Sequence, residues 1–228
     1  MLLRILRSPW NSPLFLVPKK NRQFRSVIDF RRVNEVTEDK SFPLPVLKDL
    51  LMSLGQGNKY FSSLDLVSGY WKVPMVPESM AITAFSTPQG HYHWLCMPFG
   101  LKSAPITFQR RMNTIFAEEI GKNVYIYLDD VIICGNDPES HLDSLEAVLL
   151  RLRQAGLKAK LTKCEFLKSK IQFLGHVVDG NGIRVNDDKI SCIKHFPQPK
   201  TTENVRSFLV CVDITGHSLR DFQLLLPL

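Results

Sequence analysis

Apolar residues follow two different spacings along the chain, and these spacings predict a mixture of helices and strands. One helical pattern covers residues 47–54, with leucines at positions i, i+3, i+4 and i+7, and Gly55 is a typical residue to end it. Two further helices are predicted, one over residues 141–155 and one that begins near Pro105. Short runs of β-forming residues predict strands at residues 14–17, 24–30, 60–66, 81–85 and 91–95, and a hairpin-like pair of strands at residues 171–178.

The most informative stretch is Val124 to Cys134, in which two apolar β-forming runs flank the adjacent carboxylates Asp129 and Asp130. This pattern predicts a β-hairpin with the two aspartates at the break between its strands. Aspartate is common in turns, so a plain turn is one interpretation. Adjacent like charges repel, however, and a divalent cation between them would neutralise both. A metal site is therefore the second interpretation.

Asp65 supplies a further carboxylate near the end of the predicted strand at residues 60–66. If this strand pairs beside the hairpin, Asp65 and Asp129 meet at one edge of a sheet. Oxygen ligands on a rigid sheet suit Mg²⁺, which takes water and phosphate oxygens as its other ligands. Two such ions beside a phosphate provide the in-line displacement arrangement of polymerases and nucleases. The pattern thus predicts phosphoryl transfer with two Mg²⁺ ions, for which Mn²⁺ is a substitute.

Ordered motifs then point to a family. Tyr127-Leu128-Asp129-Asp130 matches the Tyr-x-Asp-Asp motif of reverse transcriptases, and Phe61 to Tyr70 resembles the motif that holds their first aspartate. The remaining matches occur in the family's order: Ser8 to Pro13, Arg25 to Asn34, Met97 to Gln109, Phe173 to His176, Pro197 to Thr201 and Val205 to Leu209. Over residues 5–209 the chain therefore resembles the reverse transcriptase of gypsy-type LTR retrotransposons, which is part of a retrovirus-related Pol polyprotein.

The resemblance implies an α+β fold of the right-hand polymerase type, whose antiparallel palm sheet carries the catalytic carboxylates. It implies RNA-directed DNA polymerase activity, a nucleotidyl transfer that adds deoxynucleotides to a primer 3′ end. The implied partners are dNTPs, an RNA or DNA template with its primer, and the RNase H and integrase regions of the Pol polyprotein. The implied subdomains are fingers at residues 1–40 and 73–103, palm at 41–72 and 104–178, and a partial, divergent thumb at 179–228.

The resemblance also assigns roles to individual residues. The catalytic and metal-binding residues would be Asp65, Asp129 and Asp130. Nucleotide-binding residues would be Lys19, Lys20 and Arg25 on the phosphates, with Tyr70, Phe99 and Gly100 around the sugar and base. The primer would contact Phe173, Leu174, Gly175 and His176. From the residues alone, a solvated hairpin tip and a core tyrosine stay open as alternatives for the first group and for Tyr70.

The distribution of charge supports a phosphate-binding partner. The formal net charge is +7, and residues 1–32 hold eight arginines and lysines against the single acidic residue Asp29. The remainder of the chain is balanced. Clustered basic residues provide sequence-independent affinity for nucleic acid, although a solvated basic face is the plainer interpretation.

Cysteine usage and hydropathy predict the compartment. The five cysteines are odd in number and widely spaced, which argues against disulfides and for a reducing, intracellular location in the cytoplasm or nucleus. No apolar run is long enough to cross a bilayer, and the first residues lack the features of a signal peptide. Cys192 and His195 lie three residues apart, but no partner pair follows that would complete a zinc site. His91 and His93 alternate on one face of a predicted strand, for which a metal pair and plain surface histidines are the two interpretations, the second being favoured.

Two rival functions remain at this stage. The similarity weakens after Leu209 and no RNase H, protease or integrase region is recognisable, so a truncated, non-catalytic nucleic-acid-binding remnant is the main alternative. An RNA-dependent RNA polymerase would share the palm carboxylates, but the bulky Tyr70 at the sugar position argues against it.

Overall fold

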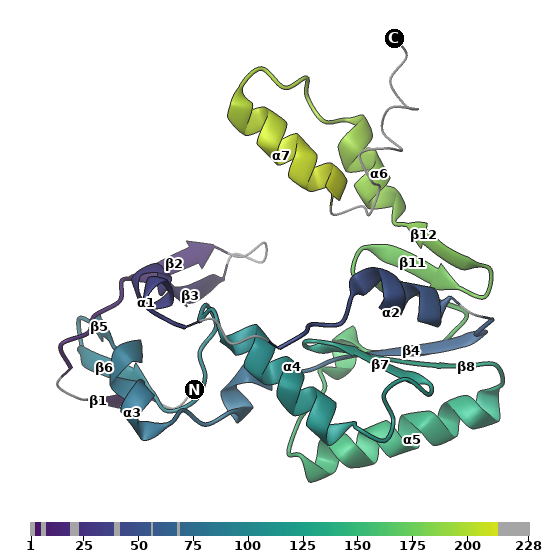
Figure 1. Ribbon diagram of the computed structural model, residues 1–228, viewed down its shortest axis with the longest axis horizontal. Coiled ribbons are helices and arrows are strands. Elements are labelled where there is room, and N and C mark those ends of the chain that lie inside the picture. Colours follow the sequence, from purple (N-terminus) through teal and green to yellow (C-terminus); the bar gives the residue numbers. More distant parts are fainter. Residues whose placement is uncertain are drawn as a thin grey trace. The chain divides into compact units, whose positions relative to one another are not determined.

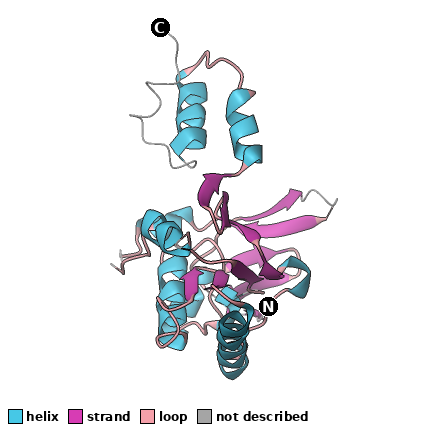
Figure 2. Ribbon diagram, turned by 90° about the vertical axis from the view of Figure 1, so that its right-hand side faces the viewer, coloured by secondary structure: helices cyan, strands magenta, loops and turns pink. Residues whose placement is uncertain are grey.

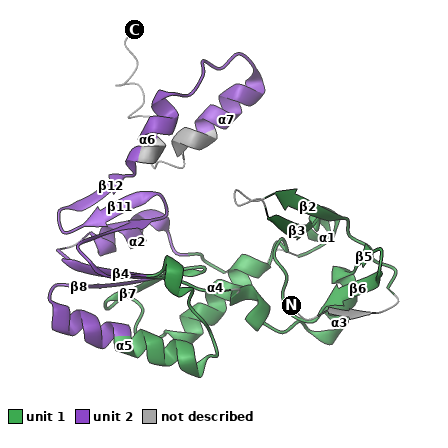
Figure 3. Cartoon of the chain, turned by 180° about the vertical axis from the view of Figure 1, so that it is seen from behind, with its two compact units in different colours: residues 1–44, 64–131, 146–164 green, residues 45–63, 132–145, 165–228 purple. Residues whose placement is uncertain are grey.

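The computed structural model describes residues 3–5, 8–18, 23–38, 42–55, 57–67 and 69–213, with helices and strands along most of its length (Figures 1 and 2). Lys19 and Lys20, which were predicted to contact a triphosphate, lie outside the described residues. The chain folds into two compact units (Figure 3), one of residues 1–44, 64–131 and 146–164 and one of residues 45–63, 132–145 and 165–228. The predicted division into fingers, palm and thumb stays a prediction.

The first unit contains two small antiparallel sheets and several helices. The predicted N-terminal hairpin is formed, because β2 pairs with β3 from Leu14 opposite Ile28 to Pro18 opposite Phe24. A three-stranded sheet has the order β1-β6-β5. The elements of this unit are β1 (Leu3–Ile5), β2 (Leu14–Pro18), β3 (Phe24–Ile28), α1 (Arg31–Glu35), η1 (Gly69–Lys72), α3 (Pro77–Met80), η2 (Ala81–Thr83), β5 (Phe85–Thr87), β6 (Gly90–Trp94), α4 (Ala104–Ile115), β7 (Val124–Tyr127) and η3 (Leu161–Lys163).

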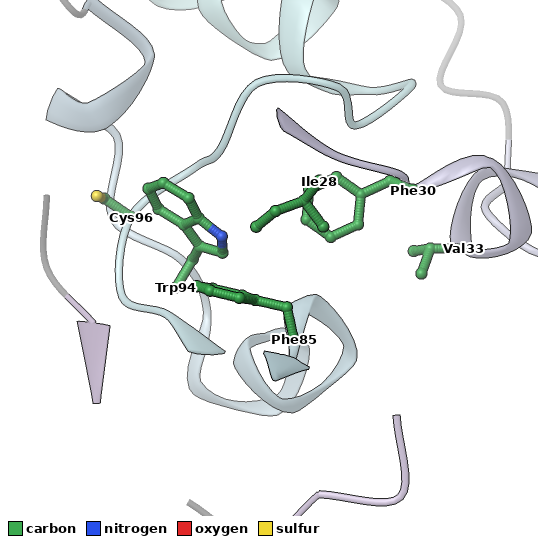
Figure 4. Close-up of a cluster of buried hydrophobic side chains, with 6 residues drawn as sticks. All are labelled: Ile28, Phe30, Val33, Phe85, Trp94 and Cys96. Atoms are coloured by element: carbon green, nitrogen blue, oxygen red, sulfur yellow. The ribbon is translucent and has the colours of Figure 1, made fainter. Parts of the chain in front are cut away.

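An aromatic core joins these N-terminal elements (Figure 4). Its buried members come from β3, α1, β5 and β6 and from the segments that follow them, namely Ile28, Phe30, Val33, Phe85, Trp94 and Cys96. Phe85 and Trp94 approach with ring centroids 6.2 Å apart, a distance typical of favourable aromatic pairs. Burial of these large side chains is the main stabilisation of this part of the unit.

The second unit contains a three-stranded antiparallel sheet of order β10-β11-β12, with α2 packed against β12. The C-terminal helices α6 and α7 contact each other, and Phe196 meets Phe208 edge-to-face at 5.2 Å. Its elements are α2 (Leu47–Leu54), β9 (Glu165–Lys168), β10 (Lys170–Phe173), β11 (His176–Asp179), β12 (Gly182–Val185), α6 (Asp187–Lys194) and α7 (Thr202–Asp213).

A four-stranded sheet of order β7-β8-β4-β9 carries the predicted carboxylates. Strands β4 (Tyr60–Asp65) and β8 (Asp130–Gly135) and helix α5 (Pro138–Gln154) each begin in one unit and end in the other. Asp65 is the last residue of β4, and Asp130 is the first residue of the neighbouring strand β8. The predicted α+β fold with an antiparallel sheet bearing these carboxylates is confirmed.

Local structure differs from the sequence prediction in several places. Residues 81–83 form the 3₁₀ helix η2 instead of a strand, because the Thr83 hydroxyl donates to Met80 O at 2.7 Å and accepts from Trp94 N at 3.0 Å. Helix α5 begins at Pro138, three residues early, because Asp137 Oδ1 accepts a hydrogen bond from Ser140 N. The strand β12 after the turn at Gly180 was not predicted.

A candidate metal and nucleotide site

The backbones that carry Asp65 and Asp129 are hydrogen-bonded to each other. Leu66 N, directly after Asp65, donates to Asp129 O at 3.1 Å. The carbonyl oxygen of Asp65 accepts a hydrogen bond from Lys160 N at 2.8 Å. The structure therefore brings Asp65, Asp129 and Asp130 to adjacent positions within the first unit, as the pairing argument predicted.

The turn of the hairpin lies one residue earlier than predicted. Leu128 and Asp129 form the turn, and Asp130 already belongs to β8. Two-residue hairpin turns commonly need a positive φ at their first central residue, and Leu128 has a φ of +54°. For a leucine this conformation costs on the order of 1–3 kcal/mol, so surrounding contacts must hold it.

Negative charge is incompletely neutralised at this site, because the pKa values of both Asp129 and Asp130 are raised. Burial, followed by the charges of Asp130 and Asp65, raises the pKa of Asp129 to about 6. Burial, followed by the charge of Asp65, also raises the pKa of Asp130. Asp129 Oδ1 is buried and accepts no hydrogen bond from the described residues. Three interacting carboxylates with an unpartnered buried oxygen fit a divalent cation.

Lys163 supplies the positive charge that the structure shows at this place. Its Nζ donates to Asp65 Oδ2 at 2.7 Å, and its charge lowers the pKa of both Asp129 and Asp130. Within the described residues, no group of three or more histidines, cysteines, aspartates or glutamates is arranged to hold a metal ion. The ammonium of Lys163 occupies one of the two carboxylate oxygens of Asp65. The sequence patterns assigned no role to Lys163, which is 98 residues from Asp65.

Tyr70 lies beside the carboxylates because Gly69 has no side chain. A Cβ on Gly69 would lie 2.4 Å from a ring atom of Phe108 and 3.3 Å from Asp129 Oδ1. Tyr70 is buried and stacks on Phe108 with ring centroids 5.0 Å apart, and it also contacts the half-exposed Phe99 at 4.9 Å. Burial, and then the charge of Asp129, raises the pKa of Tyr70 to about 12. The phenol is therefore neutral at physiological pH.

The loop that contains Phe99 and Gly100 is held by helix α1. Asn34 Nδ2 donates to Gly100 O at 2.9 Å, and Lys102 N donates to Asn34 Oδ1 at 2.8 Å. Gly100 has a φ of +93°, which favours glycine. The side chain of Asn34 thus both donates a hydrogen bond to this loop and accepts one from it. The motif match did not reveal this role.

Two predicted groups lie outside this network. Arg25 is exposed on β3 opposite Val17, and no contact among the described residues joins it to the carboxylates. Residues 173–176 belong to the second unit, where Leu174 and Gly175 form the two-residue turn between β10 and β11. Their φ values of +47° and +80° are typical of a type I′ hairpin. The flanking residues Phe173 and His176 are buried.

Comparison with known proteins identifies the class. Residues 17–178 match the family described as reverse transcriptase (RNA-dependent DNA polymerase), and the chain belongs to this family. The match includes all three carboxylates. Polymerases of this family generally use divalent metal ions.

The relatives include Pol polyproteins of LTR elements. The chain is 43% identical to the retrovirus-related Pol polyprotein from transposon 297 of Drosophila melanogaster, over 95% of this chain and 20% of that protein. It is 35% identical to the polyprotein from transposon gypsy of the same organism, over 97% of this chain and 22% of that protein. The chain thus spans about a fifth of these relatives. The expected kinship with gypsy-type retrotransposons is confirmed.

Solved structures support the same fold. The foamy viral protease–reverse transcriptase in complex with double-stranded DNA matches with a TM-score of 0.85 and 27% identity, over 92% of this chain and 37% of that chain. The same protein in complex with an RNA/DNA hybrid matches with a TM-score of 0.80 and 27% identity, over 92% of this chain and 28% of that chain. No helix in the described part of this chain is long and apolar enough to span a membrane.

Proposed function

We propose that the chain catalyses RNA-directed DNA polymerisation, in which deoxynucleotides are added to a primer 3′ end. The observation that carries the proposal is the adjacency of Asp65, Asp129 and Asp130, together with a buried oxygen of Asp129 that has no hydrogen-bond partner among the described residues. Membership of the reverse transcriptase family supports it. In the reaction the primer 3′-oxygen bonds to the α-phosphorus, and the bond to pyrophosphate breaks in line with it.

Asp65, Asp129 and Asp130 would hold two Mg²⁺ ions, for which Mn²⁺ is a substitute. When bound, the ions lower the pKa of the primer hydroxyl and neutralise charge on the triphosphate. The chain's own part is to hold the carboxylates in position at the edge of a sheet. Asp65 Oδ2 is paired with the ammonium of Lys163, so a metal that bound through this oxygen would displace Lys163.

Further residues would position the substrates. The ring of Tyr70 would close the space that a ribose 2′-hydroxyl needs, and the Phe99–Gly100 loop would line the same pocket. Arg25, Lys19 and Lys20 of the N-terminal hairpin would contact the triphosphate, because cationic groups stabilise charge that grows on the leaving pyrophosphate. Phe173, Leu174, Gly175 and His176 would contact the primer. For the fingers, palm and thumb we propose the boundaries predicted from the sequence.

The proposed partners are an RNA or DNA template with its primer, dNTPs, and the RNase H and integrase regions of a Pol polyprotein. The foamy viral relatives in complex with double-stranded DNA and with an RNA/DNA hybrid support the first of these.

Primer extension on an RNA template with Mg²⁺ tests the proposal. Asp65→Asn and Asp129→Asn should each lower the extension rate by about a thousandfold or more, since several kcal/mol of transition-state stabilisation are lost. Binding of the template–primer should change little. Asp143→Asn on the exposed face of α5 is the matched control and should extend normally. Unchanged extension in either active-site variant would refute the assignment, and duplex binding without extension by the parent chain would favour the non-catalytic alternative.

A further inference from the structure

A buried glutamine on helix α4 holds the turn that carries Asp129. Gln109 is fully buried, and its Oε1 accepts a hydrogen bond from Leu128 N at 2.7 Å. Its Nε2 donates to Ile126 O at 3.3 Å and to Asn113 Oδ1 at 2.9 Å. A backbone N–H can only donate and a backbone carbonyl can only accept, so these partners define the orientation of the amide. One side chain therefore bonds the last part of β7 and the first residue of the turn.

The residue that Gln109 holds is the strained one. Leu128 has a φ of +54°, a conformation that L-residues other than glycine, asparagine and aspartate adopt rarely. Asp129 follows directly, so a change of the Leu128 backbone would redirect the Asp129 carboxylate. On the far side, Leu66 N holds Asp129 O. The two contacts together restrain the Asp129 backbone on both sides.

Packing alone does not account for a glutamine at this position. The neighbouring residues Phe108 and Met112 on the same helix are fully buried and apolar. Burial of an amide in such surroundings is unfavourable unless its polar groups are hydrogen-bonded. An apolar side chain of similar size would fill the space, but it would leave Leu128 N and Ile126 O without this partner. The hydrogen bonds to the turn therefore explain the choice of residue.

We propose that Gln109 is a positioning residue for the polymerase reaction: it holds Leu128 in the left-handed conformation and so sets the direction of the Asp129 carboxylate. The inference rests on the proposed function, in which Asp129 is a metal ligand. Gln109 itself acts through Leu128 and contacts neither substrate nor metal. Residues that orient a metal ligand typically contribute 10- to 100-fold to metal affinity or activity.

The test uses the full chain bound to template–primer and measures Mn²⁺ affinity by electron paramagnetic resonance. Gln109→Met keeps the length of the side chain and removes its hydrogen bonds. We expect it to weaken Mn²⁺ binding and to lower kcat by about 10- to 100-fold, with KM for template–primer within about twofold of the parent. Met112→Ala is the control for a disturbed core, and it should lower the melting temperature while Mn²⁺ affinity is unchanged.

A second substitution tests whether Gln109 acts on Mn²⁺ affinity through the backbone of Leu128. Leu128→Gly allows a positive φ without strain, so it should restore most of the Mn²⁺ affinity that Gln109→Met removes, and the two changes should be non-additive. Asn113→Ala removes one anchor of the amide and should cause a smaller loss in the same direction. It keeps the test decisive if Gln109→Met does not fold. A Gln109→Met protein that is less stable but binds Mn²⁺ normally, or an absence of rescue by Leu128→Gly, would overturn the proposal.

Amide hydrogen exchange at Leu128 separates failure of this inference from failure of the proposed function. If Asp129→Asn leaves Mn²⁺ affinity unchanged, Asp129 is not a ligand and the proposed function is wrong. In that case faster exchange of Leu128 N–H in Gln109→Met still supports the part of the inference in which Gln109 holds the Leu128 backbone. Unchanged exchange overturns it.

Discussion

In the proposed function, Tyr70 is the residue whose packing bears most directly on substrate choice. Its ring stacks on Phe108 and contacts Phe99, while Asp129 is near enough to raise its pKa. These contacts leave the ring little freedom to move.

Tyr70→Ala should relax discrimination against ribonucleotides. Removal of the ring opens the space that a 2′-hydroxyl needs, and steric discrimination by one small group is worth about 10- to 200-fold. The ratio of kcat/KM for a ribonucleotide to that for the matching deoxynucleotide should rise by an amount in this range. Tyr70→Phe is the control and should discriminate as the parent does, because it keeps the ring. Equal discrimination in Tyr70→Ala would mean that Tyr70 serves only as a packing residue.

At the scale of residues, local pattern was enough to find the carboxylates but not their partners. Asp65, Asp129 and Asp130 interrupt or end apolar strands, so they stand out in the sequence. Gln109 and Lys163 act through hydrogen bonds to residues 19 and 98 positions away, which no local spacing encodes. Gln109 did leave one signal, a polar residue next to the apolar face of a helix.

At the scale of elements, a buried polar pair ties a helix to two strands within the second unit. Ser62 Oγ on β4 lies 2.7 Å from His141 Nε2 on α5, and it accepts a hydrogen bond from Leu167 N on β9 at 3.0 Å. Gly135 on β8 packs against the same histidine, because a Cβ there would lie 2.9 Å from His141 Cβ. The pair therefore fixes how α5 packs against these strands.

Stability should depend on pH through His141. Burial lowers the pKa of His141 below its ordinary value of 6.5. Below pH 6.5 the unfolded chain binds a proton that the folded chain does not, so stability is lost as the pH falls towards the folded-state pKa. Urea unfolding at several pH values between about 5 and 8 measures this loss.

His141→Gln provides the comparison for that measurement. It removes the titrating group, so the loss of stability between about pH 6.5 and 5 should be smaller than in the parent chain. Parallel profiles for the parent and His141→Gln would contradict the role of burial.

Local sequence predicted best those elements whose start and end are determined by residues within or next to the element. Helix α2 spans residues 47–54 as expected. Its leucines lie at helical spacing within the helix, and Gly55, the residue that ends it, follows directly as the C-cap. The strand expected at residues 81–85 failed, because Thr83 hydrogen-bonds to Trp94, 11 residues away, and stabilises a 3₁₀ turn. Tertiary contacts of this kind override β propensity.

At the scale of the whole molecule, family and fold followed from the order of several motifs, none of which would have been decisive alone. The side-chain contacts around these motifs could not be predicted from the motif order. In the structure Asp65 forms an ion pair with Lys163. This pair depends on the electrostatic interactions among the carboxylates and Lys163, which come together only in the folded chain.

The basic N-terminal segment should make duplex binding sensitive to salt. Neutralisation of Arg4, Arg7 and Arg22 should flatten the plot of log affinity against log salt by about 0.9 for each phosphate that the variant no longer neutralises. Neutralisation of Lys48, Lys122 and Arg153, which are exposed elsewhere in the chain, is the control and should leave the slope unchanged. Fluorescence anisotropy with a labelled duplex at several salt concentrations measures both. An equal slope in the N-terminal variant would mean that this segment is a solvated face.

The central claim is that Asp65, Asp129 and Asp130 together bind the divalent ions of a polymerase. Iron(II) in place of Mg²⁺, with ascorbate and peroxide, cleaves a polypeptide backbone close to where the ion is bound. In the chain bound to template–primer and dNTP, the account predicts cuts near Asp65 and near residues 128–130, suppressed by excess Mg²⁺ and absent from both Asp65→Asn and Asp129→Asn. Cuts confined to other segments, or cuts at these two places that persist in both variants, would contradict it.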